Sequence, residues 1–538
     1  MRYFLIFLIY LGPYAHQMSA ASPGRDTNQA AKQGDALQKG LTALKENRLE
    51  EAFEELTTAE RDHPDDARVR NFRGILLVQM GKNAEAATEY QEAIRLDPTL
   101  EDAYRNLGFL RWNEHQLAQA RDMLERAVKL SPDDSFAHYY LGRVELDAQR
   151  YEQAFRELDL SHQSVPAEAG PLIQVSTGYI ALGRREDARK SLDQLMKVAL
   201  TEAQSVQFAS LLLSVHENDR AISLIQKLGG CSPSQATWAQ FDLALAYFLS
   251  EKYEKAIEQA LVYAHAENSA ALKLPEKALA WSLIGIAFAH LKQDERSVNG
   301  LRQAATNAPD DEGHWLNLTR ELMELNRYPE AITAVQSGLA ANPKSYALHL
   351  RLGAAYLAAG RYAEAESVFR ELVAAGDPLP TGYVGLAQVL LRTGRAEEAA
   401  TELGDAEKEL GPTFLISYFR GLALERAGKK SEALAAFQQA LHLNPSSAEA
   451  HLHLGKAEFA LGHLNETIAE FHEALRLDPA NTQAKRLLSQ AYQRTGDTKN
   501  ATKFAEASTT ETPATAAGDL LGDFFVPQWQ VPLEGAGK

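Results

Sequence analysis

The chain has very little cysteine: Cys231 is the one thiol among 538 residues. A single cysteine excludes an intramolecular disulfide, a Cys-x-x-Cys redox pair and any metal site built from several thiolates. No cysteine lies near the N-terminus, so a lipid-anchored lipoprotein is not expected. We interpret Cys231 as a half-buried thiol in a turn, because free cysteine behaves as a small apolar residue.

The chain also lacks an excess of positive charge. It carries 55 Lys and Arg against 72 Asp and Glu, which gives a net charge of -17. Proteins that bind nucleic acid without regard to its sequence need surplus Lys and Arg to neutralise phosphates. We therefore expect no nucleic acid partner. The acidity itself has no further functional meaning, since it commonly serves solubility.

Signatures of catalysis are missing as well. The sequence contains no Gly-x-Ser-x-Gly elbow, no His-Glu-x-x-His, no phosphate-binding loop and no Gly-x-Gly-x-x-Gly after a strand. The densest group of histidines comprises His442, His451, His453, His463 and His472. His451 and His453 are two positions apart on a predicted helix, so they point to nearly opposite sides. We expect solvated surface histidines, no catalytic residues, no metal and no cofactor.

Long hydrophobic runs are absent except at the start of the chain. Arg2 precedes an apolar run over residues 3–11, Gly12 and Pro13 interrupt it, and small residues follow at Ser19, Ala20 and Ala21. This order is typical of a secretory signal peptide, and nine apolar residues are too few to span a bilayer. We expect a signal peptide over residues 1–21, cleavage near Ala21, a secreted or periplasmic protein and no membrane span after cleavage. The alternative is a membrane tether formed by an uncleaved N-terminal segment.

What the sequence does contain is a period of 34 residues. Windows of this length open at Gln33 and again, after a phase slip, at Ala278. The eighth position of a window is repeatedly glycine, at Gly40, Gly74, Gly108, Gly142, Gly285, Gly353, Gly421 and Gly455. The twentieth position is repeatedly alanine, at Ala52, Ala86, Ala120, Ala154, Ala188, Ala365 and Ala433. Small residues at facing positions allow two helices to approach closely, so each window predicts a helical hairpin.

Turn residues mark the ends of these helices. Proline near the end of a window cannot continue a helix; it occurs at Pro64, Pro98, Pro132, Pro166, Pro309, Pro343, Pro445 and Pro479. Glycine often fills the turn inside a hairpin, at Gly81, Gly183, Gly360, Gly394, Gly428, Gly462 and Gly496, where a left-handed residue commonly ends a helix.

These residues resemble the tetratricopeptide repeat family over about residues 33–508. The motif is clear in the window with Leu352, Gly353, Tyr356, Gly360, Ala365 and Phe369, in another with Gly421, Gly428, Ala433, Phe437, Ala440 and Pro445, and in a third with Trp315, Leu318, Ala331 and Pro343. The resemblance implies an all-α fold, a right-handed α-solenoid superhelix of about fourteen hairpins whose first helices form a concave groove.

The domain organisation follows from where the period holds. We expect an N-terminal linker over 22–32, a first stack of six repeats over 33–230, an irregular repeat and joint over 231–277, and a second stack with a C-terminal cap over 278–508. Residues 202–228 resemble a shortened hairpin, and residues 252–274 an overlong second helix. The irregular region is either a joint between stacks or a drifted repeat. A flexible linker over 509–518 and an apolar aromatic tail over 519–538 complete the chain; the tail either docks on the last hairpin or presents a motif to a partner.

Function is expected in the groove. By resemblance, the lining comes from defined positions of each first helix, which in the early repeats hold Asn71, Phe72, Arg105, Asn106, Phe109, Trp112, Phe136, Tyr139, Tyr140 and Arg143. Aromatic residues interleaved with arginine are typical anchors of protein interfaces. Alternatively, several of these aromatics pack between adjacent hairpins.

Two binding patterns of the family do not match. The chaperone-tail clamp needs Lys and Asn across three consecutive repeats, but Asn106 is flanked by Ile75 and Tyr140 at the corresponding positions. The asparagine ladder of the glycosyltransferase-linked superhelices is absent too, because the sixth position of a window is Asn only at Asn106 and Asn317. We predict a non-enzymatic scaffold that binds a peptide or partner protein. The alternative is a structural or assembly subunit of a bacterial envelope, secretion or polysaccharide-export complex.

Overall fold

A computed structural model describes residues 27–228, 233–265, 274–376 and 379–509. The expected signal peptide over 1–21, most of the linker over 509–518 and the aromatic tail over 519–538 lie outside the described residues. All regular secondary structure in the described part is helical, from α2 to α29. The all-α fold expected from the repeats is therefore confirmed.

The first helices and their partners run in chain order. They are α2 (Thr27–Lys45), α3 (Leu49–Asp62), α4 (Ala67–Gln79), α5 (Asn83–Leu96), α6 (Glu101–Asn113), α7 (Leu117–Leu130), α8 (Ser135–Asp147), α9 (Tyr151–Ser161), α10 (Ala169–Ala181), α11 (Arg185–Leu195), α12 (Glu202–Ser214), α13 (Asn218–Lys227), α14 (Pro233–Leu249) and α15 (Tyr253–Ala264). The remainder are α16 (Leu274–His290), α17 (Asp294–Asn307), α18 (Glu312–Glu324), α19 (Tyr328–Ala341), α20 (Tyr346–Ala358), α21 (Tyr362–Ala374), α22 (Thr381–Arg392), α23 (Ala396–Leu410), α24 (Phe414–Arg426), α25 (Lys430–Leu443), α26 (Ala448–Leu461), α27 (Leu464–Leu477), α28 (Thr482–Thr495) and α29 (Thr498–Thr509).

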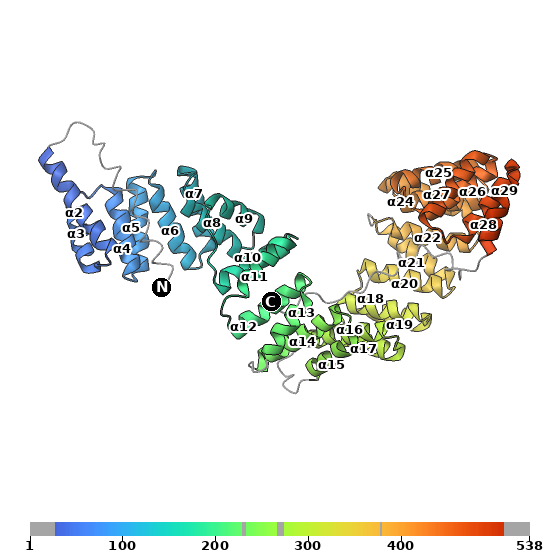
Figure 1. The fold of residues 1–538 in the computed structure, drawn as a ribbon, viewed down its shortest axis with the longest axis horizontal. Helices are drawn as coiled ribbons and strands as arrows, with labels where there is room; N and C mark the ends of the chain where they lie inside the picture. Colours follow the sequence, from blue (N-terminus) through green and yellow to red (C-terminus); the bar gives the residue numbers. More distant parts are fainter. Residues whose placement is uncertain (1–26, 229–232, 266–273, 377–378, 510–538) are drawn as a thin grey trace. The chain divides into compact units, whose positions relative to one another are not determined.

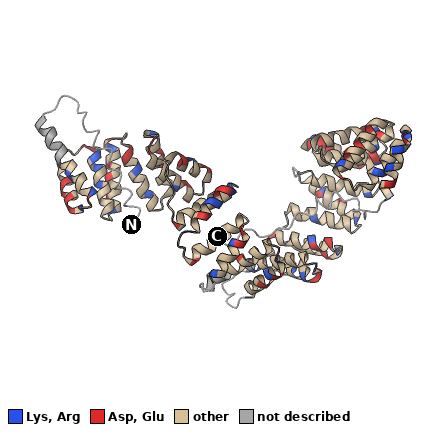
Figure 2. Ribbon diagram, viewed as in Figure 1, with Lys and Arg blue, Asp and Glu red and all other residues tan. Residues whose placement is uncertain are grey.

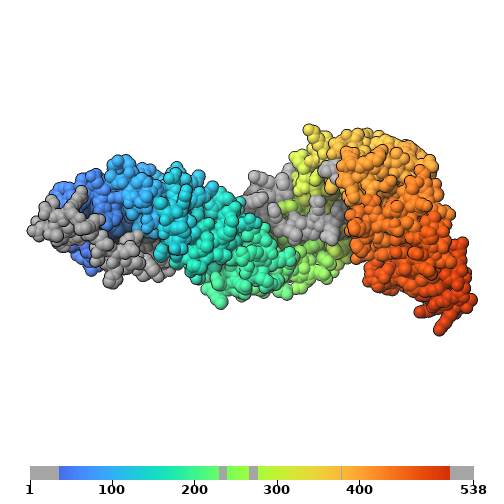
Figure 3. Space-filling model, turned by 90° about the horizontal axis from the view of Figure 1, so that it is seen from above, coloured from blue at the N-terminus to red at the C-terminus, as the bar shows by residue number. Residues whose placement is uncertain are grey.

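The chain divides into two compact units, Met1–Leu224 and Ile225–Lys538. Within each unit the helices pair as hairpins, and each hairpin packs on the next one in the chain, so the colours of Figures 1 and 3 advance in sequence order along a unit. The even-numbered first helices also contact one another across neighbouring hairpins, as α4 contacts α6 and α18 contacts α20. Each unit is thus an α-solenoid in which the first helices form one continuous face, which we call the first-helix face.

Close helix pairing depends on the glycine at the eighth position. An added Cβ on Gly421 in α24 would lie 2.5 Å from Cε1 of Phe437 in α25, and one on Gly74 in α4 would lie 2.5 Å from Cε1 of Tyr90 in α5. Phe437 is fully buried and cannot move aside freely. The expectation that glycine permits close approach is therefore confirmed.

The turn inside each hairpin holds a residue in the left-handed conformation. Gly81 has φ of 77° and Gly428 has φ of 76°, as the glycine pattern predicted. Where glycine is missing, the same turn position still has positive φ, at Asn47, Gln149 and Lys292 among others. The hairpin geometry thus imposes this conformation whether or not the residue favours it.

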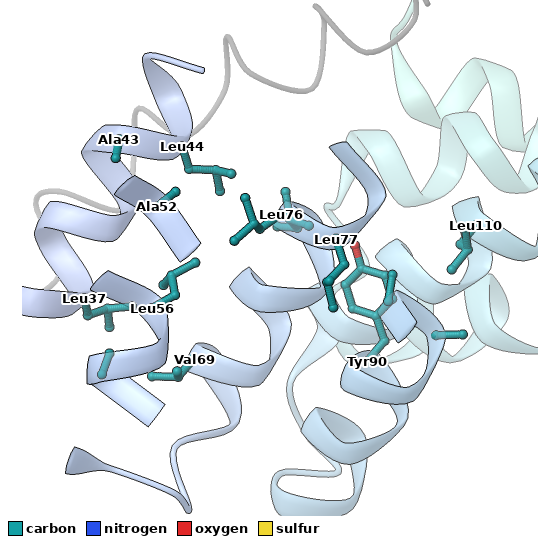
Figure 4. Packing of buried hydrophobic residues seen from close by; sticks show 14 of the residues in the cluster. Leu37, Ala43, Leu44, Ala52, Leu56, Val69, Leu76, Leu77, Tyr90 and Leu110 are labelled. Atoms are coloured by element: carbon teal, nitrogen blue, oxygen red, sulfur yellow. The ribbon is translucent and has the colours of Figure 1, made fainter. Parts of the chain in front are cut away.

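The core is built between hairpins as well as within them. Figure 4 shows Leu44 of α2, Leu56 of α3 and Leu76 of α4 meeting in one cluster that continues through Tyr90 of α5 to Leu110 of α6. Leu44 and Leu56 are fully buried. No single hairpin could bury these side chains, so neighbouring repeats stabilise one another.

Two details of the sequence analysis are wrong. Helix α2 begins at Thr27, so residues 27–32 belong to the first helix and not to a linker. Helix α15 ends at Ala264, so residues 252–274 are not one overlong second helix. The extra length lies partly in α14 and α16, first helices of 17 residues each, and partly in 266–273, outside the described residues.

The described helices differ in length and in hydropathy. None of them is both long enough and apolar enough to cross a bilayer.

We predict that Gly421→Ala lowers the free energy of unfolding by about 1–3 kcal/mol, because the new methyl group must displace the buried ring of Phe437. Gly404→Ala is the matched control, since Gly404 lies in the middle of helix α23 and an added Cβ would have Arg420 Nε as its nearest neighbour, at 3.7 Å. Alanine is the better helix former, so this control should be neutral or slightly stabilising. Urea denaturation followed by circular dichroism measures both; equal effects of the two substitutions would contradict the packing argument.

Candidate functional site

The candidate site residues lie on α4, α6 and α8, three consecutive first helices of the first unit. Acidic N-caps start two of these helices: the carboxylate of Asp66 accepts a hydrogen bond from the backbone N–H of Arg68, and Asp134 accepts from those of Phe136 and Ala137. These caps set where α4 and α8 begin, and hence which positions face the neighbouring first helix.

Arg105 links the start of α8 to α6. Its guanidinium forms ion pairs with Asp102 on its own helix and with Asp134, the cap of α8. Burial opposes the charge, but the two carboxylates outweigh burial and raise the pKa of Arg105 above its ordinary value. Arg105 is therefore engaged within the protein, with its remaining surface half-buried.

The two asparagines form a buried pair. Asn106 Nδ2 donates to Asn71 Oδ1 at 2.9 Å, and the side chains are 2% and 3% exposed. Phe72 packs against the core cluster between α2 and α6. The asparagines therefore fix the contact between α4 and α6 by a hydrogen bond shielded from water.

The aromatic residues gather around Tyr140. Its ring centroid lies 4.8 Å from that of Phe109 and 5.4 Å from that of Tyr139. Phe109 and Tyr140 are buried, and burial raises the pKa of Tyr140 to about 12. Trp112, Phe136 and Tyr139 pack around them and stay half-buried. Part of the predicted patch thus belongs to the core between hairpins, while the other aromatics keep an accessible surface.

Arg143 lies among these rings with little exposure. The side chain is 5% exposed, and its guanidinium lies 5.2 Å from the Trp112 ring centroid and 6.0 Å from that of Tyr139. It donates to Tyr139 Oη at 3.1 Å and to Gln174 Oε1 at 3.4 Å. Among the described residues, no carboxylate forms an ion pair with Arg143. Its charge is therefore held by π faces and neutral oxygens.

Asp147 completes the network and was missed by the sequence analysis, as was Gln174. Trp112 Nε1 donates to Asp147 Oδ2 at 2.5 Å, and Gln174 Nε2 donates to Asp147 Oδ1 at 2.6 Å. Asp147 thereby ties together α6, α8 and α10. The signal that could have found both residues is their repeat position. Asp147 is the thirteenth residue of the window that holds Tyr139 and Arg143, and Gln174 is the sixth residue of the next window, from which no residue was predicted.

The resulting surface, which we call the Arg143 cluster, comprises Trp112, Phe136, Tyr139, Arg143, Asp147 and Gln174. It offers half-buried aromatic faces, the carboxylate of Asp147 and the amide of Gln174, with the largely buried cation of Arg143 among them. Such a surface suits contact with a polypeptide. In the described part of the chain, no group of three or more His, Cys, Asp or Glu is arranged to hold a metal ion.

Three of the five histidines of the last repeats, His442, His463 and His472, are exposed as expected, whereas His451 and His453 are half-buried. His451 Nδ1 lies 2.6 Å from Glu470 Oε2 on α27, whereas His453 Nδ1 lies 2.9 Å from Glu425 Oε2 on α24. The two rings do point to opposite neighbours, as their spacing predicted. His451 therefore links the two helices of its own hairpin, and His453 links its hairpin to the preceding one.

We predict that Asp147→Ala destabilises the first unit by about 1–3 kcal/mol, because the indole N–H of Trp112 and the amide of Gln174 lose their shared acceptor. Asp122→Ala is the control, since Asp122 is exposed and its ion pair with Arg126 spans 3.9 Å; little change is expected. Urea unfolding followed by tryptophan fluorescence measures both variants. A stability loss no larger than that of the control would show that Asp147 does not tie the three helices together.

Known proteins resemble this chain along its repeats. Family models described as tetratricopeptide repeat match residues 106–169, 316–380, 380–405 and 448–481, and those described as TPR repeat match 74–114 and 421–462. Cellulose synthase 2 operon protein C of Komagataeibacter xylinus is 24% identical over 476 residues, covering 73% of this chain and 35% of the relative. A TPR repeat-containing protein of Treponema pallidum is 29% identical over 206 residues, covering 35% of this chain and 23% of the relative. The chain thus spans about a third or less of the length of these relatives.

Solved structures resemble it at low sequence identity. Yeast Tom70 is 15% identical with a TM-score of 0.38, covering 82% of this chain and 99% of that structure. The APC/C hetero-tetramer Cut9–Hcn1 is 15% identical with a TM-score of 0.34, covering 80% of this chain and 98% of the matched chain. The repeated matches to the family models, together with the helical hairpins, show that the chain belongs to the tetratricopeptide repeat family.

Proposed function

We propose that the chain is a non-enzymatic scaffold that binds an extended peptide or a helix of a protein partner on the first-helix face of the first unit. The observation that carries this proposal is the Arg143 cluster. It places a cation without a carboxylate partner beside half-buried aromatic rings on adjacent first helices. A partner would gain contact area from the rings and orientation from the arginine.

The energetic argument favours a protein partner over a small molecule. Aromatic side chains bring large contact area at a low cost in conformational entropy. Trp112 and Gln174 are already held by Asp147, so binding need not order them. Preorganisation of this kind increases affinity without adding contacts. The rows of first helices extend the same surface along several repeats, which suits an elongated ligand.

A second function is supported by one comparison. The similarity to cellulose synthase 2 operon protein C covers 73% of this chain, and its name places that relative in a polysaccharide-synthesis operon. By this proposal the repeats are a structural or assembly subunit of an envelope, secretion or polysaccharide-export complex. Contacts would then be made through the second helices or through residues 519–538, and not through the Arg143 cluster.

We also propose that the scaffold works outside the cytoplasm. Support comes from the sequence of residues 1–21, which has the order of a signal peptide: a basic residue, a short apolar run and small residues. The alternative is a protein tethered to a membrane by this segment.

Site-specific photo-crosslinking tests the binding surface. We expect benzoylphenylalanine in place of Phe136 or Tyr139 to capture the same partner, and the probe in place of Phe53 to capture none. Phe53 is the control because it is 39% exposed and lies on the second helix α3. Adding Arg143→Met should reduce capture at position 136 at least tenfold, since hydrogen bonds to charged groups contribute about 1.5–3 kcal/mol. Capture only through second helices or residues 519–538 would favour the assembly function instead.

The N-terminus of the protein recovered from its native host tests the location. We expect intact-mass spectrometry to show a chain that begins near residue 22, in a soluble envelope or extracellular fraction. Retention of residues 1–21 in a membrane fraction would support the tether. Retention of Met1 in the cytoplasmic fraction would contradict export altogether.

A further inference from the structure

A second site emerges when the contacts of the Arg143 cluster are compared with the second unit. In the first unit, Arg143 on α8 contacts Gln174 on α10, 31 residues further along the chain. In the second unit, Arg320 on α18 and Arg351 on α20 are the same number of residues apart and occupy the same two positions of their windows. The glutamine of the first unit is therefore replaced by a second arginine.

Arg351 is a buried charge without a counter-ion. The side chain is 4% exposed, and its NH1 nitrogen is buried without a hydrogen-bond acceptor. Within the described ranges, no residue forms a hydrogen bond or an ion pair with Arg351. Polar groups buried in this way are rare in folded proteins, because a charge removed from water needs a partner to offset the loss of hydration.

The groups around Arg351 do not offset its charge. Arg320 pairs with Glu324 at 2.9 Å, and Glu324 is 44% exposed at the edge of the site. Burial, followed by repulsion from Arg320, lowers the pKa of Arg351 to about 10, so the guanidinium stays charged at neutral pH. Burial and then Arg320 and Lys292 lower the pKa of His290 on α16, against the opposite effect of Glu251 and Glu324, so this histidine adds no positive charge at neutral pH. Glu321 and Glu324 of α18 both offset the charge of Arg320, whereas among the described residues no carboxylate forms an ion pair with Arg351.

We propose that Arg351, with Arg320 beside it, forms a carboxylate-binding subsite on the first-helix face of the second unit. The ligand is a carboxylate of a bound polypeptide, which would give Arg351 the acceptor that the protein does not supply. This inference rests on the proposed scaffold function and deepens it, because it states the chemistry of the partner. The residues differ from the Lys and Asn of the chaperone-tail clamp that the first stack lacks.

Arginine is suited to this role because its planar guanidinium donates to a carboxylate through two parallel hydrogen bonds. The same chemistry could come from an Asp or Glu side chain or from a chain terminus. Long-range attraction does not explain such binding, since the protein carries a net charge of -17 and both signs are mixed over the helices of Figure 2. Affinity for an acidic peptide would therefore require a local site.

Binding of fluorescein-labelled hexaglutamate to the full chain tests the subsite. We expect fluorescence anisotropy at low salt to show tighter binding of hexaglutamate than of hexaglutamine. Arg351→Met should weaken hexaglutamate binding at least tenfold, and Arg320→Met should also weaken it. Arg476→Met removes the same charge from an exposed position that pairs with Glu473 and should change affinity less than twofold. A hexaglutamate with an amidated C-terminus separates the two sources: equal binding indicates side-chain carboxylates, and loss of binding indicates the chain terminus.

Thermal unfolding of the same variants adds a readout that needs no ligand. Arg351→Met should keep or raise the melting temperature, because replacing an unpaired buried charge by an apolar side chain of similar length is often stabilising. We therefore expect Arg351→Met to lose hexaglutamate binding while its melting temperature stays the same or rises. The proposal is overturned if the wild-type chain does not bind hexaglutamate, if Arg351→Met binds as well as wild type, or if Arg476→Met loses as much affinity. The crosslinking experiment uses the first unit and a cellular partner, so the two proposals can fail separately.

Discussion

The close approach of two helices at one glycine is the constraint on which the rest of the structure depends. At Gly421 and Gly74 a ring from the second helix occupies the space that a Cβ would need. Because the pairing distance is set there, the hairpin turn has little freedom, and it takes the left-handed conformation even at Gln149 and Lys292. The hairpins then offer the same apolar faces at the same spacing, so one repeat packs on the next.

The sequence was sufficient to predict the parts of the fold that repeat. The glycine and alanine that recur at the eighth and twentieth positions of the windows predicted the helix pairing. Turn glycines such as Gly81 predicted the left-handed residues, because backbone sterics restrict which residues fit in those turns. Where the period failed, the prediction failed too: α15 ends at Ala264, and the added length went into the first helices α14 and α16. In this region no repeated glycine or alanine position marks the helices, and the spacing of apolar residues alone could not place the ends of α14, α15 and α16.

The candidate site was predictable only in outline. Repeat position selected Trp112, Tyr139 and Arg143, which the structure does bring together. It could not separate a ring that faces a partner from one that fills the core, since Phe109 and Tyr140 were also predicted to line the groove and are buried. Whether a ring is buried depends on the size of the residue that it meets on the neighbouring helix. The repeat position of the ring alone does not reveal that residue. Arg351 was not predicted for the same reason: its repeat position does not show that it lacks an ion-pair partner.

Side-chain contacts between first helices recur at fixed separations along the chain. Asn71 bonds Asn106 and Trp112 bonds Asp147 over 35 positions, and Tyr346 bonds Thr381 over the same distance. Each partner therefore lies one repeat away, and none depends on a remote part of the polypeptide. Tandem duplication of a 34-residue unit creates a junction that supplies the same donors, acceptors and apolar faces as before. Length can consequently change in evolution by whole hairpins while every intermediate remains a foldable protein.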